Sequence, residues 1–211
     1  MEKPVVIFGA GDLGRAALEI FESNKVIIYC LLDDDSALHG TEVDNVSIMG
    51  STDEESIRSL LGKKAEAFIA LDDNRVRKTL VKSLKEKQKA VPVNAIHSTA
   101  QISFSASLGH GNFINNRVVV ASGVEIGSHC ILNSGSVIDH NCKLGSYVQV
   151  GAGTTIAAGV SIEDDVFIGT GAVLVPGIKI GKNARIGAGS VVVENIKANQ
   201  TVFGNPATVI K

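Results

Sequence analysis

One of the five histidines lies in a context that could support acid–base chemistry. His140 follows Ile138 by two residues and is flanked by Asp139 and Asn141. An imidazole with an ordinary pKa of about 6.5 can remove a proton from a nucleophile near neutral pH. The competing interpretation is a solvated histidine in a turn.

The other histidines have no comparable context. Metal sites need clusters of His, Cys, Asp or Glu at ligand spacing, and His39, His97, His110 and His129 lack such neighbours in the sequence. The sequence therefore predicts no metal, and it predicts surface positions for His110 and His129.

A second motif lies near the N-terminus. Gly9, Gly11 and Gly14 fit the pattern G-x-G-x-x-G between a predicted strand and a predicted helix. Such glycines allow a tight turn and bring backbone amides close to phosphate oxygens. The motif predicts a nucleotide site, although the second half of a dinucleotide domain is missing; the alternative is a turn that only packs strand against helix.

The segment that carries His140 has a strict six-residue period. Every sixth residue from 96 to 192 is Ile, Leu or Val, which gives 17 matches at 17 positions. A fixed period signals a solenoid, and six residues suit a parallel β-helix in which each hexapeptide supplies one strand and one turn. Three hexapeptides complete a coil, so residues 18 apart stack, and the array should hold between five and six coils. Small residues directly after the aliphatic position and at the fifth place of each hexapeptide fit tight corners, from which His140 would point outward.

The first 90 residues follow a different pattern. Short apolar runs at 5–8, 26–32 and 67–71 alternate with segments of helical spacing at 16–21, 54–61 and 76–85. This order predicts a small parallel sheet with helices on its faces. The predicted fold class is therefore α/β plus all-β, with a Rossmann-like domain at 1–92 and a β-helix at 93–211.

The amino-acid composition limits the classes of partner that the chain could bind. Hydrophobic residues make up 45% of the 211 residues, charged residues 20%, and the net charge is −2, which is ordinary for a globular protein and offers no basic patch for nucleic acid. The first apolar run is too short for a signal peptide, and no membrane role is expected. Three cysteines without a CxxC motif favour a reducing compartment, which we expect to be the cytoplasm.

Residues 96–211, including the closing segment VFGNPA at 202–207, resemble the hexapeptide-repeat acyltransferases, whose prism is a left-handed parallel β-helix. With the preceding α/β domain, the whole chain resembles bacterial UDP-4-amino-sugar N-acetyltransferases and sialic acid O-acetyltransferases. The resemblance implies acetyl-CoA as co-substrate and a homotrimer with active sites between subunits. It also implies a nucleotide-sugar-binding role for residues 1–92.

The resemblance assigns roles in the predicted β-helix. His140 resembles the catalytic base, and Asn141 stands where close relatives often have a carboxylate. Asp139 is expected to point away from His140, so an orienting partner would come from elsewhere. Ala158, 18 residues after His140, would donate its amide to the thioester oxygen. The expected contacts to coenzyme A are Gln149, where relatives often have histidine, and Thr170 and Ala188, which match pantetheine contacts.

Further substrate contacts are expected from both segments. Asn133 either orients the acceptor or forms a hydrogen-bonded corner ladder with Asn115, and Lys179, Lys182 and Arg185 either meet the 3′-phosphate of CoA or are solvated. In the N-terminal segment, the resemblance implies Gly11, Asp12 and Leu13 at the phosphates, Asp33 and Asp34 at the nucleoside, and Asp72 where relatives commonly have a glycine facing the nucleotide.

These residues predict acetyl transfer to the amino group of a UDP- or GDP-linked amino sugar. Two alternatives remain: O-acetylation of a sugar or sialic-acid hydroxyl, which would use the same base, and a non-catalytic scaffold that binds sugar nucleotides.

Overall fold

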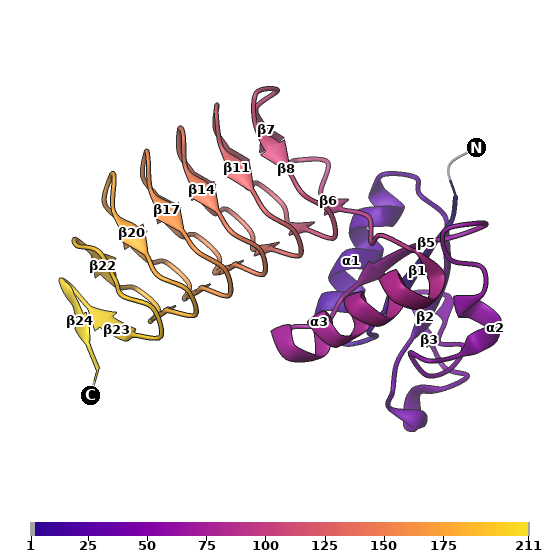
Figure 1. The fold of residues 1–211 in the computed structure, drawn as a ribbon. Helices are drawn as coiled ribbons and strands as arrows, with labels where there is room; N and C mark the ends of the chain where they lie inside the picture. The colour runs from indigo at the N-terminus through magenta and orange to yellow at the C-terminus, as the bar shows by residue number, and fades with distance from the viewer. Residues whose placement is uncertain (1–2, 211) are drawn as a thin grey trace. The chain divides into compact units, whose positions relative to one another are not determined.

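The computed structural model describes residues 3–210. The chain divides into two compact units, Met1–Ala95 and Ile96–Lys211. Their architectures match the predicted α/β domain and the predicted parallel β-helix (Figure 1).

The first unit is built on a parallel sheet of three strands in the order β2-β1-β5. Helix α1 packs on one face, where the rings of Phe21 and Phe68 meet edge to face at 5.5 Å. Helices α2 and α3 pack on the other face, where Phe8 and Leu32 join Leu80 in one apolar cluster. The elements are β1 (Val5–Phe8), α1 (Asp12–Ser23), β2 (Ile28–Leu32), η1 (Ser36–Leu38), α2 (Glu55–Arg58), β5 (Glu66–Ile69), α3 (Asn74–Ser83) and the π-helical turn η2 (Leu84–Gln88).

A short hairpin in this unit was not expected from the sequence. It joins β3 (Glu42–Val43) to β4 (Val46–Ser47). The two turn residues, Asp44 and Asn45, both have positive φ, at 47° and 68°, as a tight hairpin turn requires. Strands of two residues are too short to show an alternating pattern, but the Asp-Asn pair is a recognisable turn signal.

The second unit consists of two-residue strands stacked into three parallel sheets (Figure 1). Each strand pairs with the strand 18 residues away, as Val119 does with Val137, which confirms the predicted coil length. The six-stranded sheet holds β7 (Gln101–Ile102), β10 (Val119–Val120), β13 (Val137–Ile138), β16 (Thr155–Ile156), β19 (Val173–Leu174) and β22 (Val191–Val192). The five-stranded sheet holds β8 (Ser107–Leu108), β11 (Glu125–Ile126), β14 (Lys143–Leu144), β17 (Ser161–Ile162) and β20 (Lys179–Ile180).

The third sheet has eight strands. Six belong to the coils: β6 (Ala95–Ile96), β9 (Phe113–Ile114), β12 (Ile131–Leu132), β15 (Gln149–Val150), β18 (Phe167–Ile168) and β21 (Arg185–Ile186). The other two are β23 (Thr201–Gly204), parallel to β21, and β24 (Ala207–Val209), antiparallel to β23. This hairpin closes the end of the prism and contains the segment that the sequence marks as a terminal loop.

The periodic aliphatic residues form the core of the prism. From Ile114 to Val192 all of them are buried, and those near the start, such as Ile102, are partly buried against the same cluster. Glycines that follow them allow the coils to approach closely: a Cβ on Gly169 would lie 2.5 Å from the amide nitrogen of Ala188 on the next coil. The residues at these corners are therefore small because neighbouring coils approach closely, as predicted.

No helix within residues 3–210 is long and apolar enough to cross a bilayer.

Candidate active site

His140 lies at the corner between the six-stranded and five-stranded sheets, directly after β13. Its side chain is 61% exposed, and its Nδ1 contacts Oδ1 of Asp139. The backbone N–H of His140 donates to the same oxygen at 2.7 Å. With Nδ1 engaged by a carboxylate, Nε2 is the ring nitrogen left to accept a proton.

The expectation that Asp139 points away from His140 is wrong. It assumed that strand alternation continues past Ile138, but β13 ends there and Asp139 already belongs to the corner. Hydrogen bonds from the backbone and the ring of His140 lower the pKa of the Asp139 carboxyl. The carboxylate that Asn141 cannot supply therefore comes from the residue before His140.

Asn141 has a conformational role in the structure. Its φ is 58°, in the left-handed region, which Asn adopts more readily than most residues. Glycines with φ between 69° and 74° hold the equivalent positions on other coils, at Gly123, Gly159 and Gly177. The turn geometry thus accounts for Asn141 without a catalytic role.

Ala158 lies on the coil adjacent to His140. Strands β13 and β16 pair in register, and the Gly159 amide donates to the carbonyl of His140 at 2.9 Å. Within residues 3–210, the Ala158 N–H has no hydrogen-bond partner. A backbone N–H without a partner can donate to an oxygen that gains negative charge during a reaction.

Thr170 and Ala188 stack at a different corner, between the eight-stranded and six-stranded sheets. The Gly189 amide donates to the Thr170 carbonyl at 2.8 Å, while the amides of Thr170 and Ala188 have no partner in the described part of the chain. Both corners border the six-stranded sheet. Gln149 lies on β15 in the eight-stranded sheet, so the structure does not group it with His140 in one chain.

Two alternatives that the sequence left open for the prism can be compared with the structure. The side-chain amide of Asn133 donates to the Val150 carbonyl at 3.1 Å, which supports a structural corner role. Lys179 and Arg185 lie on different sheets, and the Arg185 guanidinium stacks over Phe167 at 4.6 Å, so they do not form one basic cluster.

His129 is buried, contrary to its predicted surface position. Its ring stacks on Tyr147 at 5.0 Å, and the exposed His110 meets it edge-on at 4.9 Å. Residues 129 and 147 are 18 apart, so successive coils bring their rings together. Within residues 3–210, no group of His, Cys, Asp and Glu could hold a metal ion.

In the first unit, the three glycines of the turn have different environments. Gly9 has φ 109°, and a Cβ there would lie 2.4 Å from the Ala70 carbonyl oxygen; a Cβ on Gly14 would lie 2.1 Å from the Gly9 oxygen. These two glycines are required for packing. A Cβ on Gly11 would face open space, and Gly11 caps α1 without a side-chain hydrogen bond.

The first turn of α1 can therefore present its amides to an anion. Asp12 opens the helix, whereas the Leu13 side chain is buried in the core, so only its main chain is available. Asp33 supports the glycine turn: its Oδ2 accepts from the Ala10 amide at 2.7 Å and its Oδ1 from the Asp35 amide at 2.9 Å.

Asp34 differs from its neighbour because it lines a pocket of about 530 Å³. Its Oδ1 accepts from the Thr52 amide at 2.8 Å. Leu71, Arg75 and Val76 also line this pocket, which places the end of β2 and the start of α3 around one space. The structure thus joins Asp34, but not Asp33 or Asp72, to this pocket.

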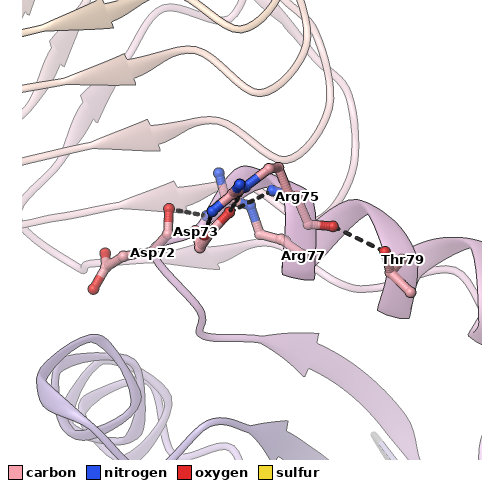
Figure 2. Close-up of polar contacts among 5 residues, drawn as sticks. All are labelled: Asp72, Asp73, Arg75, Arg77 and Thr79. Atoms are coloured by element: carbon pink, nitrogen blue, oxygen red, sulfur yellow. Dashed lines mark hydrogen bonds and ion pairs between the residues drawn. The ribbon is translucent and has the colours of Figure 1, made fainter.

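Asp72 lies in a tightly held turn before α3. The buried Arg77 guanidinium donates to the Leu71 carbonyl and to Asn74 Oδ1, which fixes the turn. Figure 2 shows the Asp72 carboxylate directed away from the group formed by Asp73, Arg75 and Arg77.

Asp73, which sequence reasoning missed, caps α3. It accepts from the Arg75 amide at 2.7 Å and pairs with its guanidinium at 2.9 Å. The side-chain hydrogen bond from Arg75 is the main cause that lowers the pKa of Asp73 to about 2. An aspartate just before a helical segment is a capping signal that could have identified it.

Comparison with protein families gives two matches. Residues 4–84 match the family described as PglD N-terminal domain. Residues 105–140 and 159–193 match the bacterial transferase hexapeptide family of six repeats. No curated protein matches the chain.

Several solved structures are similar to this chain over its full length. PerB from Caulobacter crescentus, in complex with CoA and GDP-perosamine, is 31% identical, with a TM-score of 0.90 and coverage of 100% of this chain and 99% of that chain. A variant of perosamine N-acetyltransferase from the same bacterium is 30% identical, with a TM-score of 0.90 and coverage of 100% and 98%. The acetyltransferase domain of PglB from Neisseria gonorrhoeae, in complex with acetyl coenzyme A, is 26% identical, with a TM-score of 0.91 and complete coverage of both chains.

Proposed function

We propose, since this chain belongs to the bacterial hexapeptide-repeat sugar acetyltransferase family, that it transfers the acetyl group of acetyl-CoA to the amino group of a nucleotide-linked amino sugar. The similar structures include one in complex with acetyl coenzyme A and others in complex with CoA and GDP-perosamine. The observation that carries the mechanism is the placement of His140, oriented by Asp139, one coil from the free amide of Ala158.

In the proposed reaction, the sugar amine attacks the thioester carbonyl carbon while Nε2 of His140 takes a proton from the amine. The carbonyl oxygen gains negative charge, and the Ala158 N–H donates to it. The C–S bond then breaks, and the departing thiolate of CoA takes the proton from His140. The products are the acetamido sugar and free CoA.

Acetyl-CoA supplies the activated acetyl group, and its pantetheine arm would lie along the corner that carries Thr170 and Ala188. The backbone N–H groups of both residues have no partner within residues 3–210. They can therefore donate to amide groups of the arm without breaking a hydrogen bond between coils. Gln149 lies on β15 of the eight-stranded sheet, which borders this corner, and its contact with coenzyme A stays a prediction.

The first unit would hold the nucleotide part of the acceptor. The α1 N-terminus, with Gly11, Asp12 and the main chain of Leu13, is suited to the phosphates. Asp34 would lie on the nucleoside side, while Asp33 keeps the glycine turn in place. This division gives the adjacent aspartates separate tasks.

The active form would be a homotrimer with a site at each subunit contact. The outward residues of the six-stranded sheet form a mostly apolar row of Val119, Val137, Val173 and Val191, in which Gln101 and Thr155 are the polar members. The corresponding row on the five-stranded sheet is polar and contains the ion pair of Glu125 and Lys143 at 2.8 Å. Because the two corners with site residues border the apolar sheet, packing this sheet against a second copy would place both at one cleft.

The function is tested by following thiol release from acetyl-CoA with a panel of UDP- and GDP-linked amino sugars and with their 4-hydroxy analogues. We expect turnover with one amino sugar and an amide in the product by mass spectrometry and NMR. Turnover only with hydroxyl acceptors would replace N-acetylation by O-acetylation. No turnover together with no binding of CoA would refute an acetyltransferase.

A further inference from the structure

Phe104 is the most exposed large apolar side chain in the described part of the chain. Its exposure is 102%, whereas that of Ile27, the next most exposed, is 71%. It follows β7, which lies in the first coil of the prism (Figure 1). A phenyl ring wholly in water is unfavourable, but single exposed apolar residues are common on protein surfaces. The place of this residue in the coil therefore matters more than its exposure.

Phe104 occupies the same corner of the prism as His140. Each is the second residue after the inward aliphatic residue of its strand, Ile102 and Ile138, and the two are 36 residues, or two coils, apart. Strand β10 pairs in register with both β7 and β13, so the structure keeps this spacing. Two strand separations place the two backbones roughly 10 Å apart along the corner.

The turn that carries Phe104 differs from the three turns that follow it on this corner. Each of those turns donates a backbone N–H to the carbonyl of the corner residue one coil earlier. At the first coil, the Gly123 amide instead donates to Ser105 Oγ at 3.2 Å. Ser103 Oγ lies 3.1 Å from Ser105 Oγ and accepts from the Ser105 amide at 3.4 Å. Two serine side chains therefore hold this turn, and the Phe104 ring is not needed for its packing.

Ser122 is the one corner residue between Phe104 and His140. Its side chain is small and exposed, so a ligand placed over it can contact both of the larger side chains. A pyranose that offers its amine to Nε2 of His140 would cover Ser122 and bring its ring toward Phe104. The acceptor sugar is therefore the part of the proposed substrates that suits this position.

The chemistry of the phenyl ring also favours a sugar at this position. A pyranose exposes C–H bonds on its faces, and their hydrogens carry a small positive charge. The face of an aromatic ring is negative, so the two attract each other when they stack. The stack also removes the Phe104 ring from water. Because the ring has neither a charge nor a hydrogen-bond donor, it is not suited to holding the diphosphate.

We propose that Phe104 is a substrate-positioning residue, which stacks on the C–H face of the acceptor sugar and directs the amine toward His140. This inference rests on the proposed function, because the sugar is that of the nucleotide-linked acceptor. It adds a contact that depends on the sugar and not on the nucleotide.

Equilibrium titration of the full-length protein with UDP- and GDP-linked amino sugars, and with UDP and GDP alone, tests this contact. The wild type should bind one sugar nucleotide more tightly than the corresponding bare nucleotide. Phe104→Ala should weaken binding of that sugar nucleotide about fivefold to tenfold, roughly what one aromatic contact contributes, and leave the affinity for the bare nucleotide unchanged. Phe104→Leu, which has no flat ring, should behave like Phe104→Ala, and Phe104→Tyr should bind like the wild type.

Val209→Ala is the matched control, since Val209 is a 51% exposed apolar residue on β24, outside the six-stranded sheet. It should leave both affinities unchanged. Because Phe104 is fully exposed, Phe104→Ala should keep the Tm and the oligomeric state of the wild type. A loss of oligomers in Phe104→Ala would assign the ring to a contact between copies and overturn the proposal. Equal weakening of the sugar nucleotide and the bare nucleotide would also overturn it.

The outcome is separable from that of the acetyl-transfer test, because titration requires no turnover. Sugar-dependent binding that is lost in Phe104→Ala, without acetyl transfer to any acceptor, would support the contact and refute the proposed reaction. Acetyl transfer by Phe104→Ala with an unchanged KM for the acceptor would refute the contact and leave the reaction intact. A wild-type protein that binds no sugar nucleotide more tightly than its bare nucleotide would likewise refute the contact.

Discussion

At the scale of single residues, the contact between Asp139 and His140 bears on the orientation of the proposed base. The carboxylate contacts Nδ1 and the backbone N–H of the same histidine, so it can hold the ring and favour the tautomer with a free Nε2. The pair is largely solvent-exposed, which limits its electrostatic strength. Asp139 should therefore act chiefly by positioning.

Asp139→Asn is expected to lower kcat about tenfold, a fraction of what a general base contributes, with little change in KM for either substrate. Steady-state kinetics at neutral pH, with each substrate varied in turn, would show this separation of kcat from KM. A raised KM with unchanged kcat would indicate a binding role instead.

The proposed oxyanion donor can be removed by a proline substitution, because proline has no backbone N–H. Pro176 lies 18 residues after Ala158 on the same corner column, so the coil geometry already accepts proline at this position. Ala158→Pro removes the N–H and should reduce kcat by about 10²-fold. Circular dichroism should show an intact fold; a folded variant with full activity would exclude the Ala158 amide as the donor.

Sequence context singled out His140 as the candidate base, whereas the contact between Asp139 and His140 depended on where a two-residue strand ends. Alternation predicts side-chain direction only inside a strand. The left-handed φ of 58° explains why an asparagine stands at position 141. Side-chain chemistry alone did not explain it.

At the scale of elements, helix α3, which borders the pocket beside Asp34, depends on its N-terminal cap. Asp73 accepts from the Arg75 amide, and its pKa is lowered from 3.8 to about 2. Because the pKa is lowered, the ionised carboxylate stabilises the folded state fully above about pH 4. This stabilisation is lost as the pH falls through the pKa of the folded state, which is about 2.

Asp73→Ala should therefore lower Tm at neutral pH, and the difference from the wild type should shrink as the pH falls toward 2, the approximate folded pKa. Asp73→Asn keeps a capping side chain and should lie between the two at neutral pH. Thermal scans across this range provide the measurement. A difference that is constant with pH would show that the carboxylate charge does not contribute.

The periodic part of the fold could be predicted almost completely, because each hexapeptide repeats the same local requirement for one inward aliphatic residue and one corner. The pocket between α2 and α3 could not. Its lining comes from Asp34, Thr52, Arg58 and the start of α3, and no local pattern indicates that these segments meet.

At the scale of the whole molecule, the proposed active site depends on a second copy of the chain. The valine row on the six-stranded sheet includes Val119 and Val173, which are 37% and 39% exposed in one chain. Contacts between copies leave only such indirect signs in a single sequence. The trimer was therefore predicted from the family resemblance.

Val173→Asp is expected to break the trimer into monomers, because it would bury a charge at an apolar contact, and to abolish acetyl transfer. Ser161→Asp on β17 of the five-stranded sheet is the control and should remain trimeric and active. Sedimentation velocity with both variants checks this. A trimeric Val173→Asp protein would assign the subunit contact to another sheet.

The central claim is that His140 removes the proton from the sugar amine during acetyl transfer. The most direct test compares the wild type with His140→Ala, using the acceptor found in the panel, and measures kcat together with CoA affinity by titration. The account predicts that kcat falls about 10²- to 10⁴-fold while CoA binding and the oligomeric state stay unchanged. Turnover close to that of the wild type in His140→Ala would contradict it.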